Sequence, residues 1–239
     1  MTAKWAPAKK EFRFISAPRG AHKLGESLPL LSIIRDNLKL AGIAREAKKI
    51  IKSREVLVDG KVCSDHRRGI GLFDSVSLPK ANSHHRFVGG KLVEVNASDS
   101  KQKICKIIGK SAVAGGKIQV ALHDGRNLLL EISRISENSA SSQKSERFLP
   151  KNNYSVGDSL LLEVPEQKIS EHFKFETGAL VLVTRGANVG RLAHVHKIER
   201  GINKKLWLEH GKEKFEAPFD GVIVVGREKP AIDLGGLGE

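Results

Sequence analysis

The sequence has few of the residues that typify secreted or membrane proteins. Its 239 residues include two cysteines and one methionine, and aromatic residues make up 5% of the chain. Cys63 and Cys105 lie far apart with no Cys-x-x-Cys pair, so we expect reduced structural thiols rather than a disulfide framework. No secretory signal, lipidation signal or apolar run of membrane-spanning length is present. We therefore expect a soluble intracellular protein without a membrane partner.

Acidic residues are outnumbered by basic ones. The chain has 41 lysines and arginines against 27 aspartates and glutamates, a formal net charge of +14. Excess positive charge raises the affinity for polyanions through phosphate neutralisation and counterion release, which makes nucleic acid the first candidate partner. Hydrophobic residues make up 40% of the sequence, close to the average for globular proteins. We expect one large folded domain or two to three small ones.

The first half of the chain is divided into a basic arm and a small α/β segment. Residues 1–26 carry an excess of cations without sustained periodicity, which indicates an extended arm. Ser27 is expected to cap a helix that begins at Leu28-Pro29 and ends at Gly42, and a second helix is predicted over residues 44–53. Short strands then follow: 56–58, 61–62 and 72–78, with a turn at Asp59-Gly60.

The second half is dominated by strand patterns. From about residue 90 to 170, short apolar runs alternate with turn residues, and the stretch 133–145 is a serine-rich polar loop. Residues 171–226 contain at least four further short strands, typical of a small barrel. The predicted organisation is arm 1–26, α/β domain 27–90, β-rich central domain 91–170, barrel 171–226 and tail 227–239. The predicted fold class is α+β, mostly β.

The second predicted helix has one cationic face and one apolar face. At about 100° per residue, its basic residues fall within one arc, opposite the apolar ones. These basic residues are Arg45, Lys48, Lys49 and Lys52, and Arg54 and Lys61 extend the charge into the following hairpin. Only Glu46 relieves the charge. A solvated charged helix face is the alternative, but four cations with only one acid beside them favour a phosphate-bearing partner.

This segment resembles the S-four RNA-binding domain, which ribosomal proteins share with pseudouridine synthases and some tRNA synthetases. The matching motifs are Arg45-Glu46-Ala47-Lys48, Val56-Leu57-Val58, Asp59-Gly60-Lys61-Val62 and Asp74-Ser75-Val76. The sequence departs from the family at Leu72-Phe73, where a glycine is common. The resemblance implies that the second helix and the hairpin hold an RNA backbone, which suits structured RNA.

The stretch Thr-Arg-Gly-Ala-Asn-Val-Gly-Arg at 184–191 has two glycines but is not a nucleotide phosphate loop. It has three residues between the glycines instead of four, no Lys-Ser/Thr, and a predicted strand after it. Together with its flanking strands it resembles the KOW motif of ribosomal and transcription proteins. The resemblance implies an SH3-like KOW barrel in which Arg185, Asn188 and Arg191 face a nucleic acid or a protein. A purely structural loop is the alternative.

The remaining motifs do not assemble a catalytic or metal site. His194 and His196 share a strand face and His84 and His85 are adjacent, but a zinc site needs three or four converging ligands. His123-Asp124-Gly125-Arg126 is interpreted as a turn at the end of a strand. The Arg-Leu-Asp segment of pseudouridine synthases and the signatures of tRNA synthetases are absent. We expect no enzyme activity, no cofactor and no small-molecule substrate.

The order of these segments resembles one family, the archaeal and eukaryotic small-subunit ribosomal protein family S-four-e. The resemblance covers about residues 18–234 and includes Gly20-Ala-His-Lys-Leu, His123-Asp-Gly-Arg and Lys229-Pro-Ala-Ile. It implies a structural constituent of the cytoplasmic ribosome that binds small-subunit ribosomal RNA and neighbouring ribosomal proteins. The compact length favours an archaeal source. An RNA-modifying enzyme and a KOW-containing transcription or RNA-chaperone factor are the alternatives. The predicted RNA contacts are Lys9, Lys10, Arg13, Arg19, His22, Lys23, Arg45, Lys48, Lys49, Lys52, Arg54, Lys61, Arg185, Asn188 and Arg191.

Overall fold

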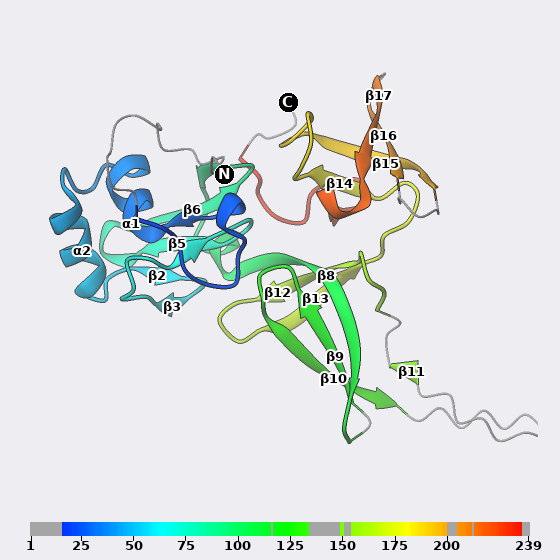
Figure 1. Ribbon diagram of the computed structural model, residues 1–239, viewed down its shortest axis with the longest axis horizontal. Coiled ribbons are helices and arrows are strands. Elements are labelled where there is room, and N and C mark those ends of the chain that lie inside the picture. The colour runs from blue at the N-terminus through cyan, green and yellow to red at the C-terminus, as the bar shows by residue number, and fades with distance from the viewer. Residues whose placement is uncertain are drawn as a thin grey trace, which may run out of the picture.

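The structure is a computed structural model that describes residues 16–115, 117–133, 149–150, 154–199, 205–211 and 213–235, with backbone alone for 131–133 and 149–150. Lys9, Lys10, Arg13 and most of the predicted polar loop lie outside these ranges. The described chain forms three large antiparallel sheets, with helices gathered at one end of the molecule (Figure 1). This is the predicted mostly-β α+β class.

The first sheet has the strand order β3-β2-β5-β6-β7. Its strands are β2 (Leu57–Val58), β3 (Lys61–Val62), β5 (Ser75–Leu78), β6 (Ser83–Val88) and β7 (Lys91–Glu94). A one-turn 3-10 helix, η3 (Pro79–Ala81), joins β5 to β6. Because β7 pairs with β6 from His85 to Val88, this sheet extends past the domain boundary that we predicted after residue 90.

Two helical segments pack beside this sheet. The first is α1 (Leu30–Ser32), which continues as the π-helical turn η2 (Ile33–Asn37), and the second is α2 (Ala44–Lys52). Their apolar side chains share a core with β2 and β5, in which Leu30, Ile34 and Ile51 are fully buried. This arrangement leaves the opposite face of α2 to solvent.

The first helix begins two residues later than predicted. Leu28–Pro29 forms the short strand β1, which pairs with β4 (Gly69–Ile70). The hydroxyl of Ser27 donates to the carbonyl of Lys23 at 3.1 Å, so it does not cap the helix. Strand pairing satisfies backbone groups that a helix starting at Leu28 would have left without partners.

The second sheet has the order β11-β10-β9-β8-β12-β13. Its strands are β8 (Gln102–Val113), β9 (Lys117–Leu122), β10 (Asn127–Ser133), β11 (Leu149–Pro150), β12 (Ser159–Glu163) and β13 (Lys168–Phe173). A 3-10 turn, η4 (Asp99–Lys101), leads into β8. Strand β13 was not predicted from the sequence, because the strand has only two apolar residues, Ile169 and Phe173, and they show no alternating pattern. Side chains of this sheet form a separate apolar core, in which Ile107, Val120 and Leu160 are fully buried.

The third sheet has the order β17-β16-β15-β14-β18, all antiparallel. Its strands are β14 (Leu180–Val183), β15 (Leu192–Glu199), β16 (Lys205–His210), β17 (Glu213–Pro218) and β18 (Val222–Gly226), with a 3-10 turn η5 (Phe219–Gly221) before β18. The predicted strands of this region are all present. Strand β14 pairs with both β15 and β18, so the strands that come first and last along the chain in this sheet are neighbours.

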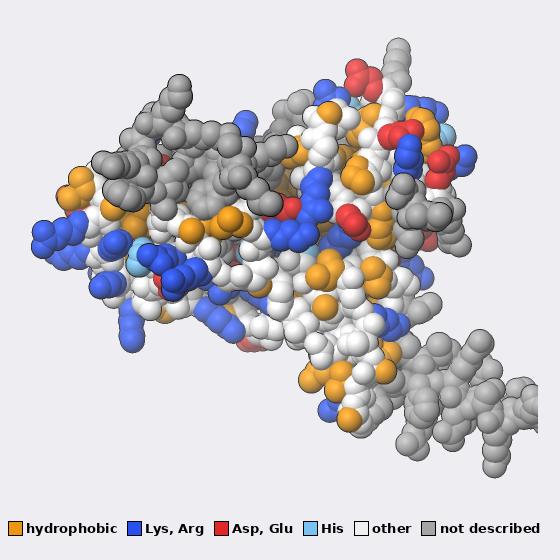
Figure 2. All heavy atoms as spheres, in the orientation of Figure 1, with side chains coloured by type: hydrophobic (Ala, Val, Ile, Leu, Met, Phe, Trp, Pro, Cys, Tyr) orange, Lys and Arg blue, Asp and Glu red, His pale blue; other side chains and the backbone are white. Residues whose placement is uncertain are grey.

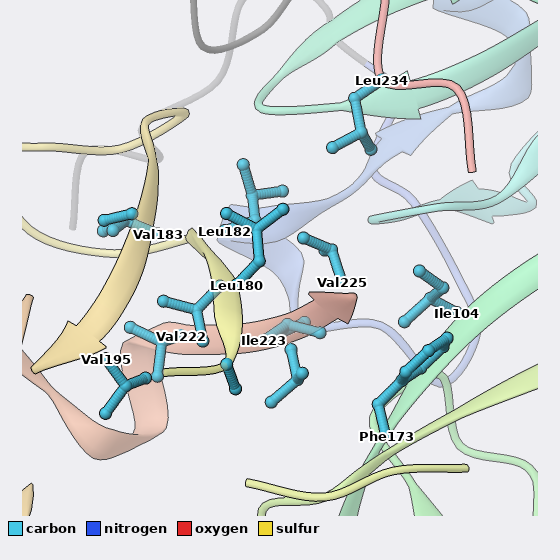
Figure 3. Close-up of a cluster of buried hydrophobic side chains, with 14 of the residues drawn as sticks. Ile104, Phe173, Leu180, Leu182, Val183, Val195, Val222, Ile223, Val225 and Leu234 are labelled. Atoms are coloured by element: carbon cyan, nitrogen blue, oxygen red, sulfur yellow. The ribbon is translucent and has the colours of Figure 1, made fainter. Parts of the chain in front are cut away.

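One apolar core joins the three sheets. Figure 3 shows Ile104 and Phe173 of the second sheet and Leu234 of the C-terminal segment around the side chains of β14, β15 and β18. Val88 of the first sheet and Phe73, in the turn just before β5, belong to the same cluster. The three sheets therefore share buried surface, which restricts their relative movement.

The described parts of the predicted arm and tail are packed against the rest of the chain. In the segment predicted as a tail, Ile232 and Leu234 are buried, and the guanidinium of Arg86 donates to the carbonyl oxygen of Asp233 at 2.9 Å. In the predicted arm, Arg19 forms a β-bridge with Arg68 of the first domain, and the 3-10 turn η1 (Leu24–Glu26) follows. The described parts of the arm and the tail are thus packed on the fold.

Candidate nucleic-acid interface

The cationic face predicted for α2 is present in the structure. Arg45, Lys48, Lys49 and Lys52 are all exposed, whereas Ala47 and Ile51 on the other side are fully buried. The carboxylate of Glu46 accepts hydrogen bonds from the backbone N–H groups of Gly42 at 3.0 Å and Ile43 at 3.3 Å. Because it caps the start of the helix, this acid stabilises α2 instead of neutralising its cationic face.

A turn after the β2–β3 hairpin adds cations that the sequence interpretation missed. His66, Arg67 and Arg68 follow Asp65, and both arginines are exposed. The carbonyl oxygens of His66 and Arg68 accept hydrogen bonds from the N–H groups of Leu31 at 3.0 Å and Leu30 at 2.9 Å. The backbone of this turn is therefore fixed to the start of α1. The run of three basic residues in the sequence was the signal that could have identified it.

The hairpin extends the same surface. Arg54 and Lys61 are exposed, and the turn between β2 and β3 places Asp59 at φ 48° and Gly60 at φ 74°. Figure 2 shows lysine and arginine side chains gathered over the end of the molecule that holds α2. Arg45, Lys48, Lys49, Lys52, Arg54, Lys61, Arg67 and Arg68 are here called the α2 surface.

Of the three predicted RNA contacts in the described part of the arm, two are exposed and one is turned inward. Arg19 and Lys23 are exposed. His22, however, turns inward, and its Nε2 lies 2.9 Å from the carboxylate of Asp74 with the imidazole side chain 9% exposed. An imidazole held against a buried carboxylate is not available to a phosphate, so the structure corrects the assignment of His22 as an RNA contact.

The loop at 184–191 lies apart from the α2 surface. Its glycines have φ 101° at Gly186 and φ 88° at Gly190, a backbone region that favours glycine. Arg185 donates from Nε to Glu26 Oε1 at 2.8 Å, and Arg191 Nη1 lies 3.2 Å from Glu213 Oε2. Asn188 is half-buried. Figure 1 shows β14 and β15, which flank this loop, at the end of the molecule away from α2. The predicted contacts therefore form two separate surfaces.

A buried ionic cluster connects the first two sheets. Lys103 on β8 is 1% exposed, and its Nζ lies 2.9 Å from Asp59 Oδ2, 3.0 Å from Asp124 Oδ2 and within contact of Asp74. Arg126 also contacts the carboxylates of Asp59 and Asp124. Asp59 and Asp74 come from the first domain, Lys103 from β8 of the second sheet, and Asp124 and Arg126 from the turn that joins β9 to β10. We call Asp59, Asp74, Lys103, Asp124 and Arg126 the Lys103 cluster.

In the Lys103 cluster, neighbouring charges shift the pKa of each described group in the direction opposite to the shift that burial alone would cause. Burial alone would lower the pKa of Lys103, but the charges of Asp74 and Asp59 raise that pKa well above its ordinary value. Burial alone would raise the pKa of Asp74, but Lys103 and His22 hold it well below the usual range. The pKa of Asp124 is lowered in the same way, chiefly by Lys103, against its burial. Lys103, Asp74 and Asp124 are therefore charged at neutral pH, and the cluster is an electrostatic contact between domains.

His123 sits beside the cluster in its neutral form. Its Nδ1 accepts the backbone N–H of Lys106 at 3.2 Å, and Nε2 faces the carbonyl oxygen of Leu72 at 3.4 Å. Burial first, and then the charge of Lys103, lower the pKa of His123 to about 4. A proton on Nδ1 would also remove the hydrogen bond from Lys106. The sequence interpretation of 123–126 as a turn missed this packing role.

We expect the stability of the protein to fall below pH 6.5 because of His123. Between its ordinary pKa of 6.5 and the folded value of about 4, the unfolded chain binds a proton that the folded chain does not. The free energy of unfolding should therefore decrease with falling pH by up to about 1.4 kcal/mol per unit in this window. Denaturant titrations from pH 7.5 to 4.5 would measure it. The variant His123→Gln should show a flatter profile, and an unchanged slope would contradict the assignment.

The described residues show neither a metal site nor a membrane span. Within those ranges, no group of three or more His, Cys, Asp or Glu side chains is placed to hold a metal ion. None of the described helices is long and apolar enough to cross a membrane.

Comparison with known proteins connects this architecture to one family. A model of Ribosomal family S4e, the S-four-e family, matches residues 82–169. The small ribosomal subunit protein eS4 of Methanocaldococcus jannaschii is 42% identical over 97% of this chain and 93% of its own length. The eS4 protein of Korarchaeum cryptofilum is 38% identical over 95% of this chain and 91% of its own. The chain belongs to the S4e family of ribosomal proteins. This is a structural family without enzymatic activity.

A solved structure of the S4e family has a similar fold. The crystal structure of the 30S ribosomal protein S4e from Thermoplasma acidophilum matches with a TM-score of 0.65 and 30% sequence identity. The match covers 85% of this chain and 96% of that chain. The likeness therefore extends beyond the family-model segment and includes most of the three-sheet architecture.

Proposed function

We propose that this protein is a structural constituent of the small ribosomal subunit that binds ribosomal RNA in the cytoplasm, beside other small-subunit proteins. Membership of the S4e family supports the ribosomal role, because the similar proteins bear the name of that subunit. The observation that supports RNA binding is the α2 surface, where cations from one helix, one hairpin and one turn lie on a fixed backbone. Such a surface suits the phosphates of structured RNA, whose bases are largely inaccessible to side chains.

The domain organisation is part of this proposal. We infer that α1, α2 and the first sheet act as an S-four RNA-binding domain and that the third sheet is an SH3-like KOW barrel. The glycine-shaped loop at 184–191 supports the second assignment. Arg185, Asn188 and Arg191 would then provide a second contact with RNA or with a neighbouring protein. The surface ion pairs of Arg185 and Arg191 are exposed, so their loss on binding would cost little.

Sedimentation tests the proposed function directly. In a high-magnesium sucrose gradient of an archaeal cell lysate, we expect the chain to migrate with the small subunit in stoichiometric amount. An RNA-modifying enzyme would be substoichiometric and released after assembly. A transcription or RNA-chaperone factor would remain in the light fractions or with polymerase. A mainly free pool of this chain would overturn the proposal.

A further inference from the structure

A small pocket opens beside the cationic face of α2. It has a volume of about 240 Å³ and is lined by Ser16, Leu31, Arg35, Ala44, Lys48, His66 and Arg67. Three of these residues, Lys48, His66 and Arg67, carry nitrogen groups that bind anions. Arg35 already donates to the Asp36 carboxylate at 2.6 and 2.9 Å, so its charge is partly neutralised. The pocket therefore has a net preference for a negatively charged group.

The pocket is preorganised by backbone contacts. The turn 65–68 is fixed to the start of α1 by the hydrogen bonds of Leu30 and Leu31 described above. Within the turn, Asp65 accepts the N–H of Arg67 at 2.9 Å, and its carbonyl oxygen accepts the N–H of Arg68 at 3.1 Å. A backbone fixed in this way lowers the entropic cost of ordering His66 and Arg67 around an anion.

We propose that this pocket binds one phosphodiester of the RNA against Lys48, His66 and Arg67, with the imidazolium form of His66 as the binding form. This inference rests on the proposed RNA-binding function. It adds to that function a particular phosphate subsite and a dependence on proton uptake. The chemistry is that of a charge-assisted hydrogen bond from an imidazolium N–H to a phosphate oxygen.

The charges around His66 explain why a phosphate should change its protonation. Burial and then Lys48 lower the pKa of His66 below its usual value, with Arg67 and Lys52 acting in the same direction and Asp65 in the opposite one. The other charged group that lines the pocket is Arg35, paired with Asp36. A phosphate among these cations favours the charged imidazole, so binding raises the pKa of His66. RNA binding then takes up a proton, and affinity rises as pH falls.

The experiment measures binding of deproteinised small-subunit ribosomal RNA to the full chain at pH 8.0 and 5.5 over a range of salt concentrations. For the wild type, we expect about tenfold tighter binding at pH 5.5, with a salt slope steeper by about 0.7 to 0.9, the value of one added phosphate contact. His66→Gln should lose both pH responses. His66→Arg, which is charged at either pH, should bind at pH 8.0 about as tightly as the wild type does at pH 5.5.

A second histidine variant is the control for the pH response, and different results would overturn the subsite and the proposed function. His196→Gln removes an exposed histidine of β15 and should leave the pH response intact. If His66→Gln keeps the wild-type response, or if His66→Arg gains nothing at pH 8.0, the phosphate subsite is wrong while the proposed function stands. If the wild type binds this RNA at neither pH, the proposed RNA-binding function itself is overturned.

Discussion

Replacing Lys103 with methionine should destabilise the protein by about 3 to 5 kcal/mol, the cost of removing one charged member from a set of buried ion pairs. Asp59, Asp74 and Asp124 would lose the ammonium group that lies among their carboxylates. Methionine retains much of the lysine volume, so the loss measures charge and not a cavity. The free energy of unfolding from a urea titration at pH 7.5 would show the effect as a lower midpoint.

Two further variants isolate the cause. Lys80→Met removes an exposed lysine that contacts Glu55, and it should change the free energy of unfolding by less than about 1 kcal/mol. The double variant Lys103→Met/Asp124→Asn also removes one of the three carboxylate charges that Lys103 contacts, and it should recover part of the stability. A Lys103→Met protein as stable as the wild type would show that the cluster contributes nothing.

Reversing two charges on α2 should weaken RNA binding by about a hundredfold at 0.1 M salt. Arg45→Glu/Lys49→Glu removes two exposed cations of the α2 surface and lies outside the residues that line the phosphate pocket. If each residue contacts one phosphate, the salt slope should fall by about 1.5 to 2. Filter binding or fluorescence anisotropy with deproteinised small-subunit ribosomal RNA would measure both quantities.

A matched variant separates this local effect from net charge. Lys168→Glu/Lys174→Glu reverses two exposed lysines in and just after β13, on the second sheet, and changes the net charge by the same amount. We expect it to retain nearly all of the affinity and slope. Equal losses in the two variants would mean that binding depends on overall charge. The α2 surface would then not be a specific site.

Local patterns predicted most of the regular structure. Helix α2, the strand β9 and the strands of the third sheet follow from apolar periodicity and turn residues, which depend on near neighbours. The first helix was placed two residues early because the competing partner of Leu28–Pro29 is the distant segment 69–70. The packed C-terminal segment was missed for the same reason, since Arg86 and Asp233 are far apart in sequence.

The candidate site was predicted in part. The exposure of Arg45, Lys48, Lys49 and Lys52 follows from helical geometry alone. The addition of His66 and Arg67 depends on how their turn is fixed to α1, which no periodicity reveals. His22 was misassigned because an exposed and an internal imidazole look the same in a sequence, and its partner Asp74 is brought close by tertiary folding. The Lys103 cluster likewise joins residues from separate sheets.

The shared core and the Lys103 cluster also have a consequence for the proposed binding of a large RNA. Because the first and third sheets are joined through buried side chains, the distance between the α2 surface and the 184–191 loop is set before any partner arrives. If both surfaces bind the same RNA, as proposed, two weak contacts on such a rigid frame act as a bivalent ligand. Once one contact has formed, the second faces its target at a high effective concentration. Loosening the connection between the sheets would reduce avidity while each surface retained its own affinity.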